Sequence, residues 1–179
     1  MTPAYILNTM KEFVESITKD MVIGDNATAP NVFIGDLPRK KGKKIDNSQS
    51  GVVVPEVVKP VRNNQLLEPE SDPSSYYPFV LLRLISFTDE ASIDDDGATM
   101  AVKFYFGTES TDQDAYLDIL HLTQVVREGL LKAGTIGGTA EVNRPLAVNI
   151  YEEQPYPQWI ATMDTTWTIP TVLREVRFN

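Results

Sequence analysis

The sequence contains no cysteine and a single histidine, His121, so two common sources of catalytic and metal-binding chemistry are almost missing. Without cysteine the chain cannot form disulfides, thiolate zinc sites or thiol nucleophiles. One imidazole, with no Ser or Cys nucleophile motif around it and no second histidine, favours neither acid–base catalysis nor a metal site. We therefore interpret His121 as a surface residue of a helix and expect no enzyme activity, cofactor or metal.

Long apolar runs are also absent. No stretch approaches the roughly 20 apolar residues that span a bilayer, and the first residues lack the basic-then-apolar layout of a signal peptide. We therefore expect a chain that folds in a cytoplasm without binding a membrane. With 179 residues, 42% of them hydrophobic, the length suits one core better than two, so residues 1–179 are predicted to form a single domain.

The charge is acidic but unevenly spread. Sixteen Lys and Arg against 25 Asp and Glu give a net charge of −9, which opposes general binding to phosphate backbones. Five of the positive residues lie in one six-residue run, so the rest carries 11 − 25 = −14. This run is the best candidate for partner contact, with an acidic protein surface, DNA or solubility alone as its possible roles; it comprises Arg39, Lys40, Lys41, Lys43 and Lys44.

Periodic apolar residues predict two amphipathic helices. The first spans residues 2–18, where Ile6, Met10, Phe13 and Ile17 recur at intervals of four, three and four. The second runs from 114 to about 132, with a capping pattern at 111–114 and Gly134 as its C-cap. Its predicted apolar stripe is Tyr116, Ile119, Leu120, Thr123, Val126 and Leu130.

Alternating and apolar runs predict strands at 32–34, 79–87, 99–106, 146–151 and 158–169, with Gly107 ending the third of them. Helices and strands do not alternate regularly, which argues against a doubly wound parallel sheet. We therefore predict an α+β fold: an antiparallel sheet of four or more strands with both helices packed on one face. The residues predicted to form the core are Val102, Phe104, Phe106, Leu120, Val126, Trp159 and Trp167.

Residues 36–77 have a different character from the rest of the chain. They hold the basic run, five prolines and many Ser and Asn, with only short apolar patches. Such a segment buries too little apolar surface to offset its ordering entropy. We expect a long extended insertion that becomes ordered when a partner covers it.

Three other motifs are predicted to have a structural role and no ligand. The acidic run Asp94–Asp96 before Gly97 does not match a calcium-binding loop, because Ser92 and Lys103 would occupy positions that need carboxylates. We predict an acidic hairpin turn there. Residues 134–138 are glycine-rich but follow a helix and lack a phosphate-binding lysine, so they are predicted to form a turn. The Glu152–Glu153 pair is predicted to be solvated.

Several sequence segments, together with the order of the predicted elements, resemble the tail terminator (tail completion) proteins of long-tailed bacteriophages and prophages. They are Tyr77–Arg83, Val102–Gly107, the helix at 114–131, Glu152–Trp159 and Thr166–Pro170. With the N-terminal helix, the resemblance spans most of the chain outside the 36–77 insertion. The insertion is a departure from the family's pattern, so the family's detailed contacts do not transfer to it.

The resemblance implies a structural protein that forms a ring, usually of six subunits, on the head-proximal end of the tail tube. There it would stop tube growth and meet the head connector, so its partners would be its own copies, the tube protein and the connector protein. DNA would pass through the lumen without specific binding. The protein would be found in the host cytoplasm during assembly and then in the virion tail.

The sequence is also compatible with other functions. The runner-up from the same biological setting is another phage neck or tail component with a similar α+β fold. A DNA-binding accessory protein using the basic run would show salt-dependent DNA retention. A small hydrolase would need a deep pocket holding His121 and a carboxylate.

Overall fold

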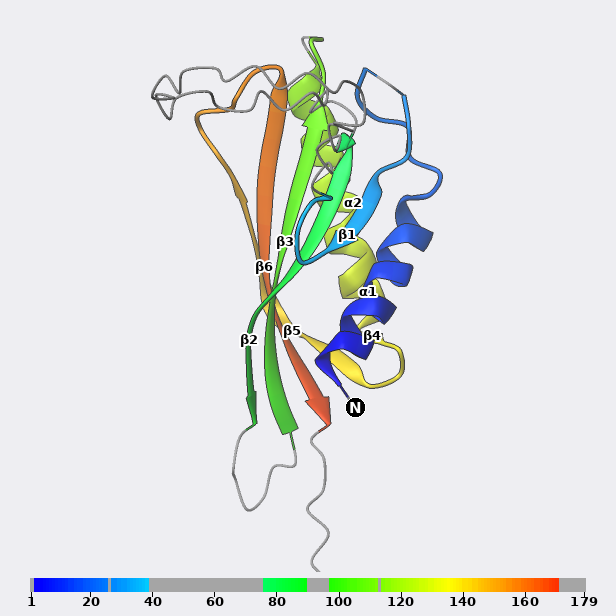
Figure 1. Ribbon diagram of the computed structural model, residues 1–179, viewed down its shortest axis with the longest axis vertical. Coiled ribbons are helices and arrows are strands. Elements are labelled where there is room, and N and C mark those ends of the chain that lie inside the picture. The colour runs from blue at the N-terminus through cyan, green and yellow to red at the C-terminus, as the bar shows by residue number, and fades with distance from the viewer. Residues whose placement is uncertain (1, 26, 39–75, 90–96, 113, 171–179) are drawn as a thin grey trace, which may run out of the picture. The chain divides into compact units, whose positions relative to one another are not determined.

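A computed structural model describes residues 2–25, 27–38, 76–89, 97–112 and 114–170. The described elements belong to one compact unit and have an α+β arrangement. The two helices are α1 (Pro3–Thr18) and α2 (Ala115–Ala133). The strands are β1 (Asn31–Ile34), β2 (Phe79–Asp89), β3 (Gly97–Glu109), β4 (Thr135–Ile136), β5 (Ala140–Ile150) and β6 (Gln158–Pro170), shown in Figure 1.

The six strands form one curled sheet in the order β1-β2-β3-β6-β5-β4. The predicted hairpin of β2 and β3 is confirmed, and β3–β6, β5–β6 and β4–β5 are also antiparallel. The prediction of a purely antiparallel sheet is wrong, because β1 pairs with β2 in parallel, from Asn31 beside Phe79 to Ile34 beside Leu82. Parallel neighbours need a long crossover connection, and the chain between Ile34 and Phe79 is long enough to supply one.

One apolar core joins both helices to the sheet. Val102, Phe104 and Phe106 of β3 are buried in the same cluster as residues of α1 and α2, as predicted. Val126 and Trp167 are also confirmed as core. The remaining two core predictions are wrong, since Leu120 and Trp159 are only partly buried. On α2 the fully buried residues are Ile119, Leu122, Val126 and Leu130.

The helix ends are partly as predicted. Thr2 is the N-cap of α1, its hydroxyl accepting a hydrogen bond from the Tyr5 N–H, and Gly134 ends α2 with a φ of 68°. The capping pattern predicted at 111–114 does not form, because Asp114 makes no side-chain cap bond. The Thr111 N–H and hydroxyl instead donate to the Asp25 carboxylate, at 3.1 and 3.2 Å from Oδ2. The side chain therefore ties two loops together instead of capping the helix.

Two glycine predictions need correction. Gly107 does not end its strand, since β3 continues to Glu109. Residues 134–138 are not only a turn: the two-residue strand β4 pairs with Ala140 and Glu141 of β5. Gly137 and Gly138, with φ of 61° and 70°, make the turn between them. This left-handed backbone is the conformation that glycine adopts without a steric penalty.

Candidate assembly surface

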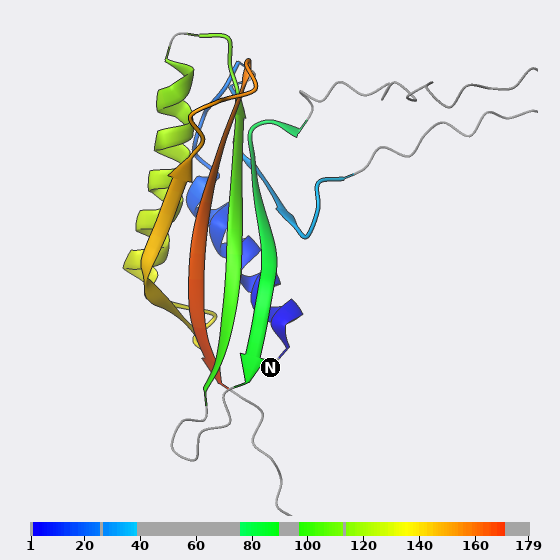
Figure 2. The same ribbon diagram turned by 90° about the vertical axis from the view of Figure 1, so that its left-hand side faces the viewer.

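Both sides of the sheet end in strands too short to cover their neighbours. On one side, β1 pairs only with Phe79–Leu82 of β2, and on the other, β4 pairs only with Ala140 and Glu141 of β5. Among the described residues, no strand pairs with the outer side of β2 at 83–89 or of β5 at 143–150. Figure 2 shows the β2 ribbon and the β5 ribbon on opposite sides, with β3 and β6 between them. Unpaired strand edges are ready sites for pairing with another chain.

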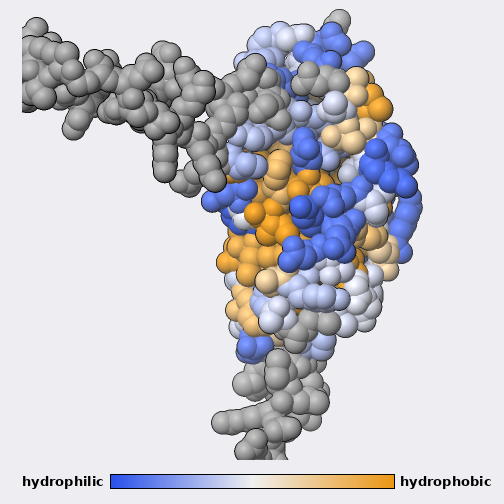
Figure 3. All heavy atoms as spheres, turned by 45° about the vertical axis from the view of Figure 1, so that its right-hand side comes forward, coloured by the Kyte–Doolittle hydropathy of each residue, from blue (hydrophilic) through white to orange (hydrophobic). Residues whose placement is uncertain are grey.

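The open part of β2 exposes large apolar side chains. Leu84, Ile85 and Phe87 are 36%, 56% and 38% exposed, although the same strand is buried from Phe79 to Leu82. A bulge between Leu84 and Ser86 interrupts the pairing with β3. Figure 3 shows apolar atoms reaching the surface of the unit beside a strongly hydrophilic area. Three large apolar residues within four positions of an unpaired edge indicate a surface that a partner covers.

The open part of β5 lies beside a shallow hollow. The hollow has a volume of about 230 Å³ and is formed by α2 and β5, with Leu120, Thr123, Gln124, Arg127 and Val148 as its lining. Leu117 of α2 and Tyr151 after β5 are exposed large apolar residues of the same two segments. A hollow that is partly apolar at an unpaired sheet edge is a natural receptor for apolar side chains.

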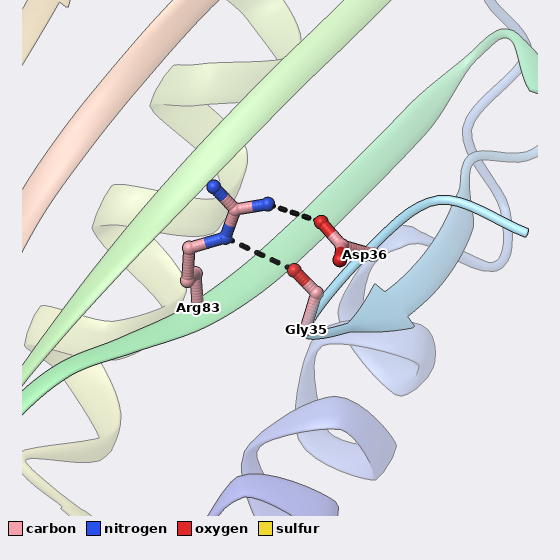
Figure 4. Close-up of polar contacts among 3 residues, drawn as sticks. All are labelled: Gly35, Asp36 and Arg83. Atoms are coloured by element: carbon pink, nitrogen blue, oxygen red, sulfur yellow. Dashed lines mark hydrogen bonds and ion pairs between the residues drawn. The ribbon is translucent and has the colours of Figure 1, made fainter.

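Arg83 fixes the point where the insertion leaves β1 (Figure 4). Its Nε donates to the Gly35 carbonyl oxygen at 3.0 Å, and its Nη2 donates to the Asp36 carboxylate. The guanidinium carbon also lies 5.4 Å from the centroid of the Tyr105 ring. Arg83 therefore holds the first residues of the insertion against β2, just before the predicted contact run begins.

The return of the insertion is attached to the same strand. The Asn31 N–H donates to the Pro78 carbonyl oxygen at 2.9 Å, and the Phe33 and Tyr76 rings meet edge to face at 6.5 Å. Tyr77 packs on Phe79, with ring centroids 5.2 Å apart. Burial and, to a lesser extent, the Glu109 carboxylate raise the pKa of Tyr77. Both ends of the insertion are thus anchored at β1 and the start of β2.

Polar pairs cross the sheet on the other side from the core residues of β3. Lys103 and Asp164 face each other on β3 and β6, 3.1 Å apart, and this hydrogen bond raises the pKa of Lys103. Asn143 donates to the Thr168 hydroxyl at 3.0 Å across β5 and β6. Such pairs are typical of a sheet face in contact with water or with a polar partner.

The structure brings together only some of the residues singled out in the sequence. Arg39, Lys40, Lys41, Lys43 and Lys44 lie outside the described residues, as do Asp94–Asp96. His121 is exposed on α2, and Glu152 and Glu153 are exposed after β5. Within the described part of the chain, no group of three or more His, Asp or Glu side chains is placed to hold a metal ion.

Sequence reasoning missed the features that dominate this surface. Arg83 and Asp36 are 47 positions apart, so no local pattern connects them. The sequence predicts a strand at 79–87 but not which of its residues lack a neighbour, because an apolar run does not show where its neighbour strand stops. The shortness of the 32–34 run becomes informative only once its pairing with β2 is known, because that pairing leaves much of β2 without a neighbour.

No helix among the described residues is long and apolar enough to cross a membrane. Comparison with known proteins gives no matching family model and no matching curated relative.

Proposed function

We propose that this protein is a structural assembly protein of a phage or prophage tail and not an enzyme. In this proposal, copies form a closed ring, a hexamer as is usual in the family it resembles, that caps the tail tube and joins it to the head connector. The observation that carries the proposal is the pair of open sheet edges on β2 and β5, each combined with apolar surface.

The geometry of the unit supports assembly through protein contacts. A monomeric protein normally protects its sheet edges or keeps them short, whereas here seven residues of β2 extend beyond β1 with three large apolar side chains exposed. The sequence resemblance over Tyr77–Arg83, Val102–Gly107 and Glu152–Trp159 supports the tail setting.

We further propose that α1 and α2 form one layer on a single face of the sheet. The basis is that residues of both helices join the same core cluster as Val102, Phe104 and Phe106 of β3. The opposite face, with the Lys103–Asp164 pair, would then be free to line the ring or to contact a partner. The acidic balance of the chain favours a lumen that lets DNA pass without gripping it.

The experiment is removal of the gene from the phage or prophage, followed by electron microscopy of the lysate. The proposal predicts tail tubes of irregular, excessive length and separate filled heads, both corrected by supplying the wild-type chain. A variant with Asp20→Asn, at an exposed residue outside both sheet edges and the resembling segments, serves as a matched control that restores normal tails. Normal tails joined to heads in the absence of the chain contradict the proposal.

A binding assay with the purified protein distinguishes the DNA-binding alternative from the assembly proposal. Retention on duplex DNA that falls steeply as salt is raised, and that disappears when the five cations at 39–44 are replaced by Gln, would support a DNA-binding accessory protein. The assembly proposal predicts no such retention at 150 mM salt, a concentration at which the Debye length is about 8 Å.

A further inference from the structure

We infer that neighbouring copies join edge to edge: the open part of β2 in one copy pairs with the open part of β5 in the next, so that the sheets continue through the assembly. This inference deepens the proposed self-assembly and rests on it. It assigns to each copy two different contact surfaces, at 83–89 and at 143–150, instead of one surface that meets itself.

Strand direction favours this pairing in a ring. β2 is antiparallel to β3, β3 to β6 and β6 to β5, so β5 runs opposite to β2 within one copy. Rotation about an axis to which the strands are tilted keeps the sense of every strand, and it therefore places β2 of one copy antiparallel to β5 of the next, with a stagger along the strands that depends on the tilt. Contacts between two different surfaces generate rings when the rotation closes.

The apolar side chains lie on matching faces. Leu84 and Phe87 stand opposite Val102 and Met100 of β3, both core residues, so they belong to the core face of the sheet. Val148 stands opposite Met163, another core residue, and belongs to the same face. In a continuous sheet the exposed apolar side chains of β2 would therefore reach the hollow between β5 and α2.

Charge favours one antiparallel register. Pairing Phe87 with Leu146 keeps both on the core face and brings Asp89 toward Arg144, two exposed residues of opposite sign. β5 is irregular between Asn143 and Ala147, so Arg144 lies outside its regular pairing with β6. Opposite charges across neighbouring strands are favourable and like charges are not. In the antiparallel register Ser86 lies opposite Ala147, and both are exposed.

The test uses disulfide cross-linking in a chain that has no cysteine of its own. Ser86→Cys and Ala147→Cys are made as separate variants, oxidised alone and as an equal mixture, and run on a non-reducing gel. Within one copy the two positions are separated by β3 and β6, about 14 Å at the usual strand spacing, which is too far for a disulfide. The inference predicts cross-linked dimers in the mixture and almost none in either variant alone.

The double variant S86C/A147C should give a ladder that ends in a closed species. A matched control, Ser16→Cys on α1 mixed with Ala147→Cys, should give no dimer above background. Dimers from Ser86→Cys alone, or from Ala147→Cys alone, would mean that a surface meets itself and would overturn the inference. An oligomer in solution without cross-linking in the mixture overturns the edge pairing but leaves self-assembly standing, whereas neither oligomer nor cross-link, both in solution and on isolated tail tubes, overturns both.

A charge exchange tests the register independently. With the cysteine pair present, Asp89→Arg or Arg144→Asp alone should lower the cross-linking rate several-fold, and the two together should restore most of it. Phe87→Glu should also lower the rate, because it places a charge in the apolar contact. If the double exchange cross-links no better than either single change, Asp89 and Arg144 do not face each other and the register is wrong.

Discussion

The ring of Phe79 lies where a side chain on Gly107 would have to go. A Cβ at position 107 would clash with Cε1 of Phe79 and would come 2.8 Å from Cε1 of Tyr77. The glycine is therefore needed inside β3 for cross-strand packing, and the two rings in turn lie where the insertion rejoins the sheet.

Gly107→Ala should destabilise the fold. Phe79 is only 4% exposed, so its ring has little room to move, and overpacking of this kind costs about 1–3 kcal/mol. Chemical denaturation measures the loss. Phe79→Leu in the same chain shortens the side chain that causes the clash, so the double variant should be more stable than the sum of the two single changes predicts. Strict additivity would show that the clash does not exist.

Phe104→Ala should cost about 3–5 kcal/mol of unfolding free energy, because the side chain is fully buried in the core cluster. Tyr156→Ala is the matched aromatic control, and with 69% of that residue exposed its effect should stay within about 0.5 kcal/mol. Both values come from denaturant titration of the purified chain. A loss under about 1 kcal/mol for Phe104→Ala would contradict the assignment of this face to the core.

Asp25 should contribute a pH-dependent part of the stability. Hydrogen bonds from Ser110 and Thr111 lower the pKa of its carboxyl below the ordinary value of 3.8. A lowered folded-state pKa means that the stabilisation is complete above that ordinary value and is lost as pH falls through the folded pKa. The wild type should therefore melt higher than Asp25→Asn at pH 6, and the difference should shrink as pH falls to 2.

Asp112→Asn, at an exposed carboxylate next to Thr111 in the chain, is the control for the general effect of removing one charge. The melting temperatures of the three proteins are compared at each pH. A constant difference between wild type and Asp25→Asn from pH 6 to pH 2 would show that the Asp25 contacts do not depend on its charge.

The basic run should act in assembly and not in folding. Replacing the five cations at 39–44 by Gln keeps the length of the insertion and should leave the unfolding free energy within about 0.5 kcal/mol. Exposed ion pairs contribute about 0.2–1 kcal/mol each, so losing several of them should weaken binding to the partner surface roughly ten-fold or more. Arg39→Lys keeps the charge and should bind normally. Equal assembly by the wild type and the Gln variant would remove the run from the account.

Much of the fold follows from local patterns. The alternation of Val102, Phe104 and Phe106 and the burial of Ile6 and Met10 in α1 depend only on which face meets the core, although Phe13 and Ile17 of the predicted stripe are only partly buried. The pairing of β1 with β2 could not be predicted, because it joins residues separated by the whole insertion. The capping prediction failed for a similar reason. Asp25, 86 positions from Thr111, accepts the hydrogen bond from the Thr111 N–H that the Asp114 side chain would accept in a capping box.

The candidate surface was harder to predict from the sequence than the fold was. An open edge is the absence of a neighbour, and Leu84, Ile85 and Phe87 have the same residue types as a buried strand. Only the length of β1, which has four residues against eleven in β2, distinguishes an open strand edge from a strand with a neighbour along its whole length. The hollow at Leu120 and Val148 depends on how α2 is rotated over β5, and a stripe spaced three and four residues apart does not fix that rotation closely enough.

The central claim, assembly into a closed ring, is tested most directly by mass. Sedimentation is measured over a wide range of protein concentration, for the chain alone and for the chain bound to isolated tail tubes. The account predicts one discrete multiple of the 20.0 kDa subunit that stops growing as concentration rises, formed free in solution or on the tube end, where a template holds subunits at high effective concentration. A monomer in both settings, or growth without limit, contradicts it.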